Sequence, residues 1–534
     1  MTSRLRWLLI AGIVVIGVAC YISYKSPSWN RAPVAETQHL PVLRLVHAER
    51  LKPPPFTDAQ FNQFLDAARK AEAIADPLQR CLVYPNPPGL DWSDAVTTAY
   101  CHYQFDPMVK PADARRLIQT GHAAELDERL AEVMHAQLSG LDTHAALDST
   151  FIIDFKNGSE ETRSLIDAWK RQSPMSPFAL AASGTAYVEM AQQVRGSDYA
   201  PKTPQSSFES MGRLLERAHA DLDKAVQIDP QVTPAYGAMI YAAALESDGA
   251  YAMNAAKRGL AVDPANYTIY ARLVWMAQPK WGGTVQEMQG IIAGAQRHAK
   301  ENPLLRLLLS ENDGGEDYVE NCNCNPITEM DLYRSVYAEA APVNMLMSGG
   351  WAAKNRNSPA LSVIYRSELL RFDPSKIDHR EGRAFDLPLL GQSDWALAEG
   401  NALIALAPQD ENVFDVRGLA YESKGDLSHA VPDYVQALRL NPDDTWTLIE
   451  LGNIYVHSTH DWDNGWAIAN RLIQMSPDNP QGWLLRASIQ KDEPRDGLNQ
   501  TISDFVARFG NNPHTQALVA NMQAMHQTTM PTQR

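Results

Sequence analysis

The chain of 534 residues is too long for one small hydrophobic core. At roughly 100–200 residues per domain, it holds about three to five globular units or one long array of repeats. Its 45% hydrophobic and 21% charged residues are typical of globular proteins and exclude a wholly disordered or collagen-like chain. The formal net charge of −16 makes it poorly suited to bind a phosphate backbone, so we expect no nucleic-acid partner.

The N-terminal residues 1–24 predict a signal anchor or signal peptide. Two arginines, Arg4 and Arg6, precede an apolar run that is about as long as a membrane crossing requires. Because positive charge favours the cytoplasmic side, the rest of the chain is expected outside the inner membrane. We therefore predict a bacterial single-pass protein held by residues 7–24, with its body in the periplasm. A lipoprotein anchored at Cys20 is the alternative.

The cysteines after this segment indicate disulfides. Cys81 and Cys101 flank a proline-rich, loop-like stretch, and closing a loop of this length stabilises by about 3 kcal/mol. Cys322 and Cys324 are separated by one residue, so a bridge between them closes a small, strained ring and their state is left open. Zinc sites prefer two to four residues between paired cysteines, so no metal is expected.

The clearest repeated unit spans residues 412–442. Gly418 and Tyr421 lie three apart in its first half, and Ala430, Ala437 and Pro442 follow in its second half. The small residues allow two antiparallel helices to approach closely, the tyrosine fills the seam, and the proline ends the second helix. This pattern resembles a tetratricopeptide repeat (TPR), which implies a stack of two-helix units.

The helix-ending prolines recur at a nearly constant interval. Pro374, Pro408 and Pro442 are 34 residues apart, and upstream Pro230 and Pro264 have the same spacing. The predicted fold is therefore all-α, a right-handed TPR-like solenoid of helix hairpins, preceded by the membrane anchor and a helical N-terminal region. The positions expected to pack the repeats are Gly350, Pro374, Ala396, Pro408, Gly418, Tyr421, Ala430, Ala437, Pro442, Gly452, Tyr455 and Pro477.

The same patterns divide the chain into segments. After the anchor we expect a Pro-rich spacer (25–56), an N-terminal helical region (57–175), irregular repeats (176–303), an acidic insertion with two cysteines (304–342), the main array (343–513) and a polar tail (514–534). The motifs FTDAQF, CLVYPNPPG, AYC and AYVEMAQQVRG also resemble a bacterial envelope family of unknown function over roughly residues 60–300. That resemblance implies no activity.

Signatures of common enzymes are missing from the sequence. It contains no G-x-S-x-G, H-E-x-x-H, phosphate-binding loop or G-x-G-x-x-G motif, so we expect no catalytic residues, cofactor or metal. A solenoid instead offers the inner face of its first helices to a protein or peptide. The positions expected on that face are Asn412, Asp415, Leu419, Glu422, Trp446, Ile449 and Asn453.

These inner-face residues suggest the chemistry of a partner. TPR relatives that clamp a C-terminal carboxylate use Lys, Arg and Asn there, whereas here only Asn453 fits and Asp415 would repel an anion. A neutral, apolar or basic partner is therefore expected. Trp446 is the candidate anchor, because tryptophan dominates interface hot spots, unless it packs the next hairpin.

The sequence leads to one principal hypothesis and two alternatives. The principal one is a non-catalytic interaction scaffold of the bacterial cell envelope. The first alternative is an envelope enzyme with its active site in residues 57–175 and substrate-recruiting repeats. The second is a structural or toxin-neutralising protein with one dedicated partner.

Overall fold

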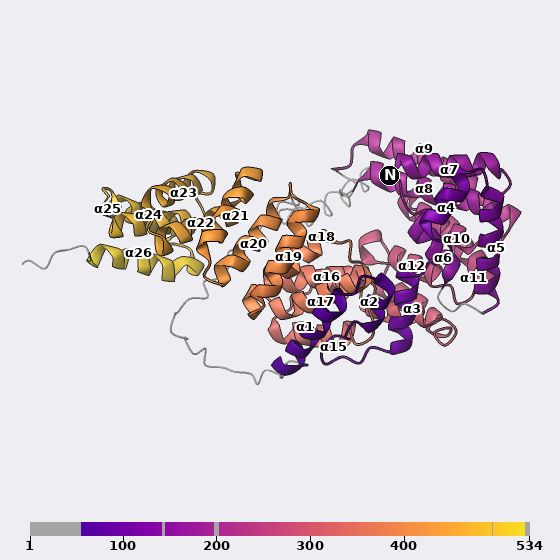
Figure 1. Ribbon diagram of the computed structural model, residues 1–534, viewed down its shortest axis with the longest axis horizontal. Helices are drawn as coiled ribbons and strands as arrows, with labels where there is room; N and C mark the ends of the chain where they lie inside the picture. The colour runs from indigo at the N-terminus through magenta and orange to yellow at the C-terminus, as the bar shows by residue number, and fades with distance from the viewer. Residues whose placement is uncertain (1–54, 141–144, 197–201, 494, 529–534) are drawn as a thin grey trace, which may run out of the picture. The chain divides into compact units, whose positions relative to one another are not determined.

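The computed structural model describes residues 55–140, 145–196, 202–493 and 495–528, and among these residues it contains helices and turns but no strand. The predicted all-helical class is thus confirmed (Figure 1). The chain forms two compact units, which divide between Ala407 and Pro408. This boundary falls inside the predicted main array.

The first unit begins with seven helices that precede the regular hairpins. Two of them, α2 and α3, are joined by the predicted disulfide between Cys81 and Cys101, whose Cα atoms lie 5.7 Å apart. The helices are α1 (Asp58–Glu72), α2 (Pro77–Val83), α3 (Asp94–Phe105), α4 (Pro111–Gln119), α5 (Ala123–Leu138), α6 (Ala146–Asp154) and α7 (Glu160–Gln172).

Helix hairpins make up most of the rest of the first unit, whereas α14 packs on α16 and α15 packs on the 3-10 helix Pro303–Glu311. Consecutive helices pack as pairs, and the first helices of neighbouring pairs, α8, α10 and α12, also pack on one another. The helices are α8 (Pro177–Arg195), α9 (Gln205–Ile228), α10 (Thr233–Glu246), α11 (Gly249–Val262), α12 (Tyr267–Met276), α13 (Val285–Gln296), α14 (Gly315–Glu320), α15 (Pro326–Val336), α16 (Val343–Asn355), α17 (Pro359–Phe372), α18 (Ile377–Asp386) and α19 (Ser393–Leu406).

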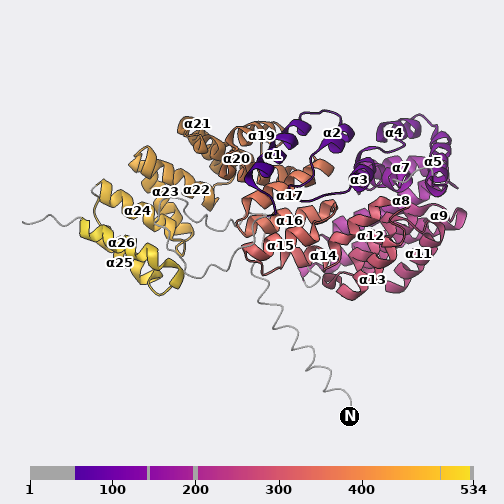
Figure 2. The same cartoon turned by 90° about the horizontal axis from the view of Figure 1, so that it is seen from below.

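The second unit continues the same design, and Figure 2 shows its helices following one another from orange to yellow. The pairs α20 with α21, α22 with α23 and α24 with α25 pack as hairpins, and α26 closes the unit against α24 and α25. The helices are α20 (Glu411–Ser423), α21 (Leu427–Leu440), α22 (Thr445–Asn453), α23 (Trp462–Met475), α24 (Pro480–Asp492), α25 (Leu498–Phe509) and α26 (Gln516–Thr528).

The recurring prolines stand where second helices end. The helices α9, α11, α17, α19, α21 and α23 each end two residues before one of them. Proline lacks an N–H and disfavours a helical conformation in the residue before it, which explains the regular stop. Within the hairpins the helices approach closely at small residues: a Cβ at Gly418 would lie 2.9 Å from the ring of Tyr434, and Ala430 and Ala437 are fully buried.

The N-terminal helices dock on later hairpins of the same unit through buried polar contacts. Figure 1 shows the indigo α1–α3 lying against α15–α17. Trp92 Nε1 donates to the carbonyl of Tyr337 at 2.9 Å, and Arg371 Nε donates to the carbonyl of Cys81 at 2.9 Å. Arg383, 1% exposed, binds both carboxylate oxygens of Glu72 at 2.5 and 2.9 Å.

This ion pair is costly to bury and requires both partners. Burial alone would raise the pKa of Glu72, but the charge and hydrogen bonds of Arg383 outweigh it and leave that pKa below its ordinary value. Arg383 also lies 3.6 Å from Glu399 and stacks 4.8 Å from the ring of Trp395. Such a pair fixes which elements meet, because either charge left alone in the interior is strongly unfavourable.

Two predicted segments differ from expectation. The acidic insertion 304–342 is largely folded: a 3-10 helix Pro303–Glu311 precedes α14 and α15, and leucines in its LLRLLL run are buried. The polar tail 514–534 contains α26, whose Val519 and Met522 are buried in a small core with α24 and α25. In both segments a few apolar residues at helical spacing determine the structure, despite a polar overall composition.

The predicted localisation requires a correction. Across the described part of the chain, no helix combines the length and the apolar character needed to cross a bilayer. The prediction of a single-pass inner-membrane protein with a periplasmic body is therefore not supported. The segments on which it rested, residues 1–24 and the alternative lipid site Cys20, lie outside the described residues, as does most of the spacer 25–56.

Candidate functional site

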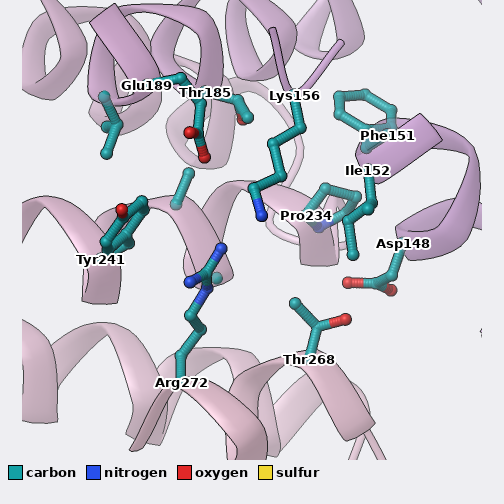
Figure 3. A pocket seen from close by; sticks show the side chains of 13 residues that line it. Asp148, Phe151, Ile152, Lys156, Thr185, Glu189, Pro234, Tyr241, Thr268 and Arg272 are labelled. Atoms are coloured by element: carbon teal, nitrogen blue, oxygen red, sulfur yellow. The ribbon is translucent and has the colours of Figure 1, made fainter. Parts of the chain in front are cut away.

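A hollow opens on the face formed by the first helices of three successive hairpins. Figure 3 shows its lining, which comes from α8, α10 and α12 and from the end of α6. We call it the inner-face hollow. Its space, counted with the open solvent at its mouth, is about 410 Å³. The residues that line it are Asp148, Phe151, Ile152, Lys156, Thr185, Val188, Glu189, Pro234, Gly237, Ala238, Tyr241, Thr268 and Arg272.

Local sequence signals place these helices. The helix α8 starts at Ser176, whose side chain accepts a hydrogen bond from the N–H of Ala179, and Pro177 fits the first helical position. Gly184 lets α9 approach, because a Cβ there would overlap the side chain of Leu222. The helix α6 begins after Ala145, whose positive φ of 53° turns the chain sharply into the helix.

Three charged side chains converge in the hollow. The ammonium of Lys156 and the guanidinium of Arg272 point toward each other, and the carboxylate of Glu189 points into the same space (Figure 3). Within the described residues, neither the amine of Lys156 nor the guanidinium of Arg272 has an ion-pair or hydrogen-bond partner. The arrangement therefore holds two positive charges that none of the described acids contacts directly.

The proximity of the two cations affects how Lys156 titrates. Arg272 and, after it, burial of the amine lower the pKa of Lys156 to about 8, while Glu189 opposes the shift and Lys376 adds to it. The lysine side chain as a whole is exposed, but its amine end points into the hollow (Figure 3). An anion placed between Lys156 and Arg272 would relieve their repulsion.

At the other side of the hollow, Asp148 is held in a buried hydrogen-bond network. Its Oδ2 accepts hydrogen bonds from Gln137 Nε2 at 2.8 Å, Thr233 Oγ1 at 2.8 Å and Asn266 Nδ2 at 3.1 Å. Burial raises the pKa of Asp148 to about 6, with a further contribution from Asp263, although the hydrogen bonds oppose it. The network ties α5, α6 and α10 together and fixes one wall of the site.

An aromatic run continues from the hollow, with one ring each from α10, α12 and the 3-10 helix Pro279–Trp281 that follows α12. The ring of Tyr241 lies 4.3 Å from the guanidinium carbon of Arg272 and 5.4 Å from the ring of Trp275. Trp281, which is 48% exposed, follows at 5.0 Å from Trp275. Tyr241, Trp275 and Trp281, the aromatic run, thus extend an apolar surface from the charged hollow toward solvent.

The positions predicted on the inner face of the second unit are less open than expected. Asp415 is fully buried and its Oδ1 accepts a hydrogen bond from Thr447 at 2.7 Å, so it does not face a partner. Trp446 is only 8% exposed and packs edge-on against Tyr434, with the ring centroids 5.9 Å apart. Trp446 thus fills the space between hairpins, which is the stated alternative to an anchor, and its role in partner binding stays a prediction.

The remaining predicted positions vary in their surroundings. Asn412 is buried at the start of α20, and Glu422 accepts a hydrogen bond from Tyr434 at 2.7 Å. Leu419, Ile449 and Asn453 are half-buried. These three therefore remain partly open to solvent.

The other predicted residues fall at helix contacts and turns. Gly350, Ala396 and Gly452 are buried within their helices, and Tyr421 and Tyr455 are half-buried near the ends of theirs. Cys322 and Cys324 form a disulfide in the turn between α14 and α15, where Arg356 Nη2 donates to the carbonyl of Cys322 at 3.2 Å. Among the described residues, no group of three or more His, Cys, Asp or Glu is arranged to hold a metal ion.

Sequence reasoning missed the hollow although its signal was present. The predicted inner-face positions Asn412, Asp415 and Leu419 stand four, seven and eleven residues after Pro408. The same offsets from Pro230 give the hollow residues Pro234, Gly237 and Tyr241. From Pro264, the offset of four gives the hollow residue Thr268, and the offset of eleven gives Trp275 of the aromatic run. Lys156 could not be found in this way, because it lies just after α6, outside the repeats.

Comparison with known proteins gives one family match. Residues 110–251 match the model of a domain of unknown function, DUF4034. This range lies within residues 60–300, for which the sequence resembles a family of unknown function, and it includes the hollow residues of α6, α8 and α10. Among curated proteins, no sequence matches the chain.

Solved structures of TPR proteins are similar to this chain, with low TM-scores and low sequence identity. The TPR domain of P58(IPK) is 12% identical, with a TM-score of 0.21 over 65% of this chain and 99% of that chain. Yeast Tom70 is 9% identical, with a TM-score of 0.30 over 88% of this chain and 96% of that chain. The Cut9–Hcn1 hetero-tetramer of the APC/C is 14% identical, with a TM-score of 0.31 over 86% and 94%.

Proposed function

We propose that the protein is a non-catalytic scaffold that binds a segment of another protein on the inner face of its helix hairpins. The observation that carries this proposal is the inner-face hollow, where three successive first helices and the end of α6 surround a space open to solvent. An extended segment crossing α8, α10 and α12 meets equivalent positions one repeat apart. Such repetition suits a polypeptide, which also presents its groups at regular intervals.

An enzyme with its active site in residues 57–175 is the second candidate, and one observation favours it. Asp148 and Lys156 come from that region, and their pKa values are shifted to about 6 and about 8, toward neutrality. However, Asp148 is only 1% exposed: three donors bind its Oδ2, and its Oδ1, although it has no partner, is buried. A base buried in this way is poorly placed to take a proton from a substrate, so binding is the better-supported function.

Site-specific photo-crosslinking in intact cells tests the proposal. The crosslinking residue p-benzoylphenylalanine replaces Tyr241, which lines the hollow, or Tyr251 on α11, which does not. We expect Tyr241 to yield a discrete crosslinked polypeptide that Tyr251 does not. The same products from both positions, or none from Tyr241, would contradict a partner-binding inner face.

A further inference from the structure

The inner-face hollow brings two positive charges close together in an acidic protein. The protein carries a net charge of −16, yet the amine of Lys156 and the guanidinium of Arg272 face each other with no acid in direct contact among the described residues. Two such donors suit an anionic group, because hydrogen bonds between ionised partners are about twice as strong as neutral ones. Arg272 also presents a planar fork that matches a carboxylate.

The surroundings of the two cations also indicate which type of anion fits the hollow. Glu189 and, farther from the two cations, Asp148 also line the hollow, so a ligand anion meets like charges there as well. A carboxylate carries one negative charge, whereas a phosphoryl group carries about 1.5 to 2 at neutral pH. The site therefore favours a carboxylate over a phosphate.

The aromatic run defines what lies beside that carboxylate. Tyr241 contacts Arg272 and begins a continuous series of rings that ends at the 48%-exposed Trp281. Large aromatic rings at a surface gain most from covering a bulky apolar side chain. A partner residue near the acidic one then lies over Tyr241 and Trp275.

We propose that the hollow recognises an acidic side chain, Asp or Glu, of the partner segment between Lys156 and Arg272, with a large apolar side chain beside it on the aromatic run. This inference rests on the proposed binding function and specifies the partner's chemistry at that site. It differs from the neutral, apolar or basic partner that Asp415 suggested, because Asp415 is buried whereas the hollow is open.

Selection from a random heptapeptide library tests the inference with the full chain. The test variant is Lys156→Gln/Arg272→Gln. Its matched control is Lys257→Gln/Arg213→Gln, which removes two positive charges from exposed positions on α11 and α9. Circular dichroism melting of each variant shows that it is folded. The wild type and the control should select peptides with Asp or Glu next to a large apolar residue.

The strongest wild-type peptide is then measured by fluorescence anisotropy. We expect its Kd to rise at least about tenfold for Lys156→Gln/Arg272→Gln and to stay within about twofold for the control. Replacing the acid in the peptide by its amide should weaken wild-type binding equally. A phosphoserine version that binds more tightly than the carboxylate would overturn the commitment to an acidic side chain.

The outcomes separate this inference from the proposed function. If the wild type selects peptides without acids, and the double variant binds them equally well, the inference fails but the scaffold function stands. If the wild type selects no peptides, and crosslinking at Tyr241 also yields nothing, the scaffold function itself fails. Binding should also weaken as pH rises past about 8, because Lys156 then loses its charge. The other charged groups around it are Arg272, Glu189, Asp148 and Lys376, and Asp148 has already lost its proton by that pH.

Discussion

Replacing Asp148 by Asn should make the stability of the first unit less dependent on pH. Burial raises the pKa of this carboxyl from 3.8 to about 6. A raised pKa means that the folded state binds the proton more tightly than the unfolded state does. The stability that protonated Asp148 provides is therefore present below pH 4 and is lost as pH rises through 6.

The size of this effect follows from the two pKa values. A difference of about 2 pKa units corresponds to about 3 kcal/mol that the wild type loses between pH 4 and pH 7.5. Asn keeps one oxygen for the three donors Gln137, Thr233 and Asn266 but carries no charge to bury. Between pH 4 and pH 7.5, the unfolding free energy of the variant should therefore rise by about 3 kcal/mol relative to that of the wild type.

Urea unfolding at pH 4 and pH 7.5 measures this difference, and hydrogen exchange of peptides from α6 and α10 assigns it to the right region. Asp504→Asn, on the exposed face of α25, is the matched control for removing a carboxylate. If the difference in unfolding free energy between Asp148→Asn and the wild type is the same at both pH values, the reasoning about this buried carboxyl is refuted.

Three further substitutions test how the fold is held together. Arg383→Met should lower the unfolding free energy in urea by about 3–5 kcal/mol, because it leaves Glu72 buried without its partner. The exposed pair of Arg115 and Glu161 provides a control: Arg115→Met should lower the unfolding free energy by less than about 1 kcal/mol. Equal costs would show that the Arg383 pair is not the contact that docks α1. Ala430→Leu should lower the melting temperature through a cost of about 1–3 kcal/mol, since Ala430 is fully buried in its hairpin, and an unchanged melting curve would mean that the repeat register is wrong. Cys81→Ser/Cys101→Ser should cost about 3 kcal/mol in denaturant unfolding by releasing the closed loop, and no change would indicate that the loop is already ordered without the bond.

The repeated hairpins were predictable because their signals are local. Pro374, Pro408 and Pro442 end helices wherever the rest of the chain lies, and small residues such as Gly418 and Ala430 are required by contacts inside one hairpin. The inner-face offsets from the prolines identify most residues of the hollow on α10 and α12 when they are applied to the upstream repeats. The periodicity of the sequence thus predicts the repeated hairpins and part of the hollow.

The remaining features depend on contacts that are distant in sequence. Arg383 and Glu72 are 311 residues apart, and neither residue type predicts burial by itself. Lys156 reaches the hollow because α6 packs on α10, which no repeat pattern indicates. Likewise, Trp446 is of a residue type that often anchors partners, but the packing of neighbouring hairpins buries it against Tyr434.

Hydrogen exchange with and without the selected heptapeptide tests the central claim most directly. If a partner segment lies in the inner-face hollow, the peptide should slow exchange at the end of α6 around Lys156 and in α10 and α12, and leave α9 and α11 unchanged. Lys156→Gln/Arg272→Gln should lose this protection at the same peptide concentration. Protection confined to α9 and α11, or to α20–α26, would contradict the assignment of the hollow as the binding site.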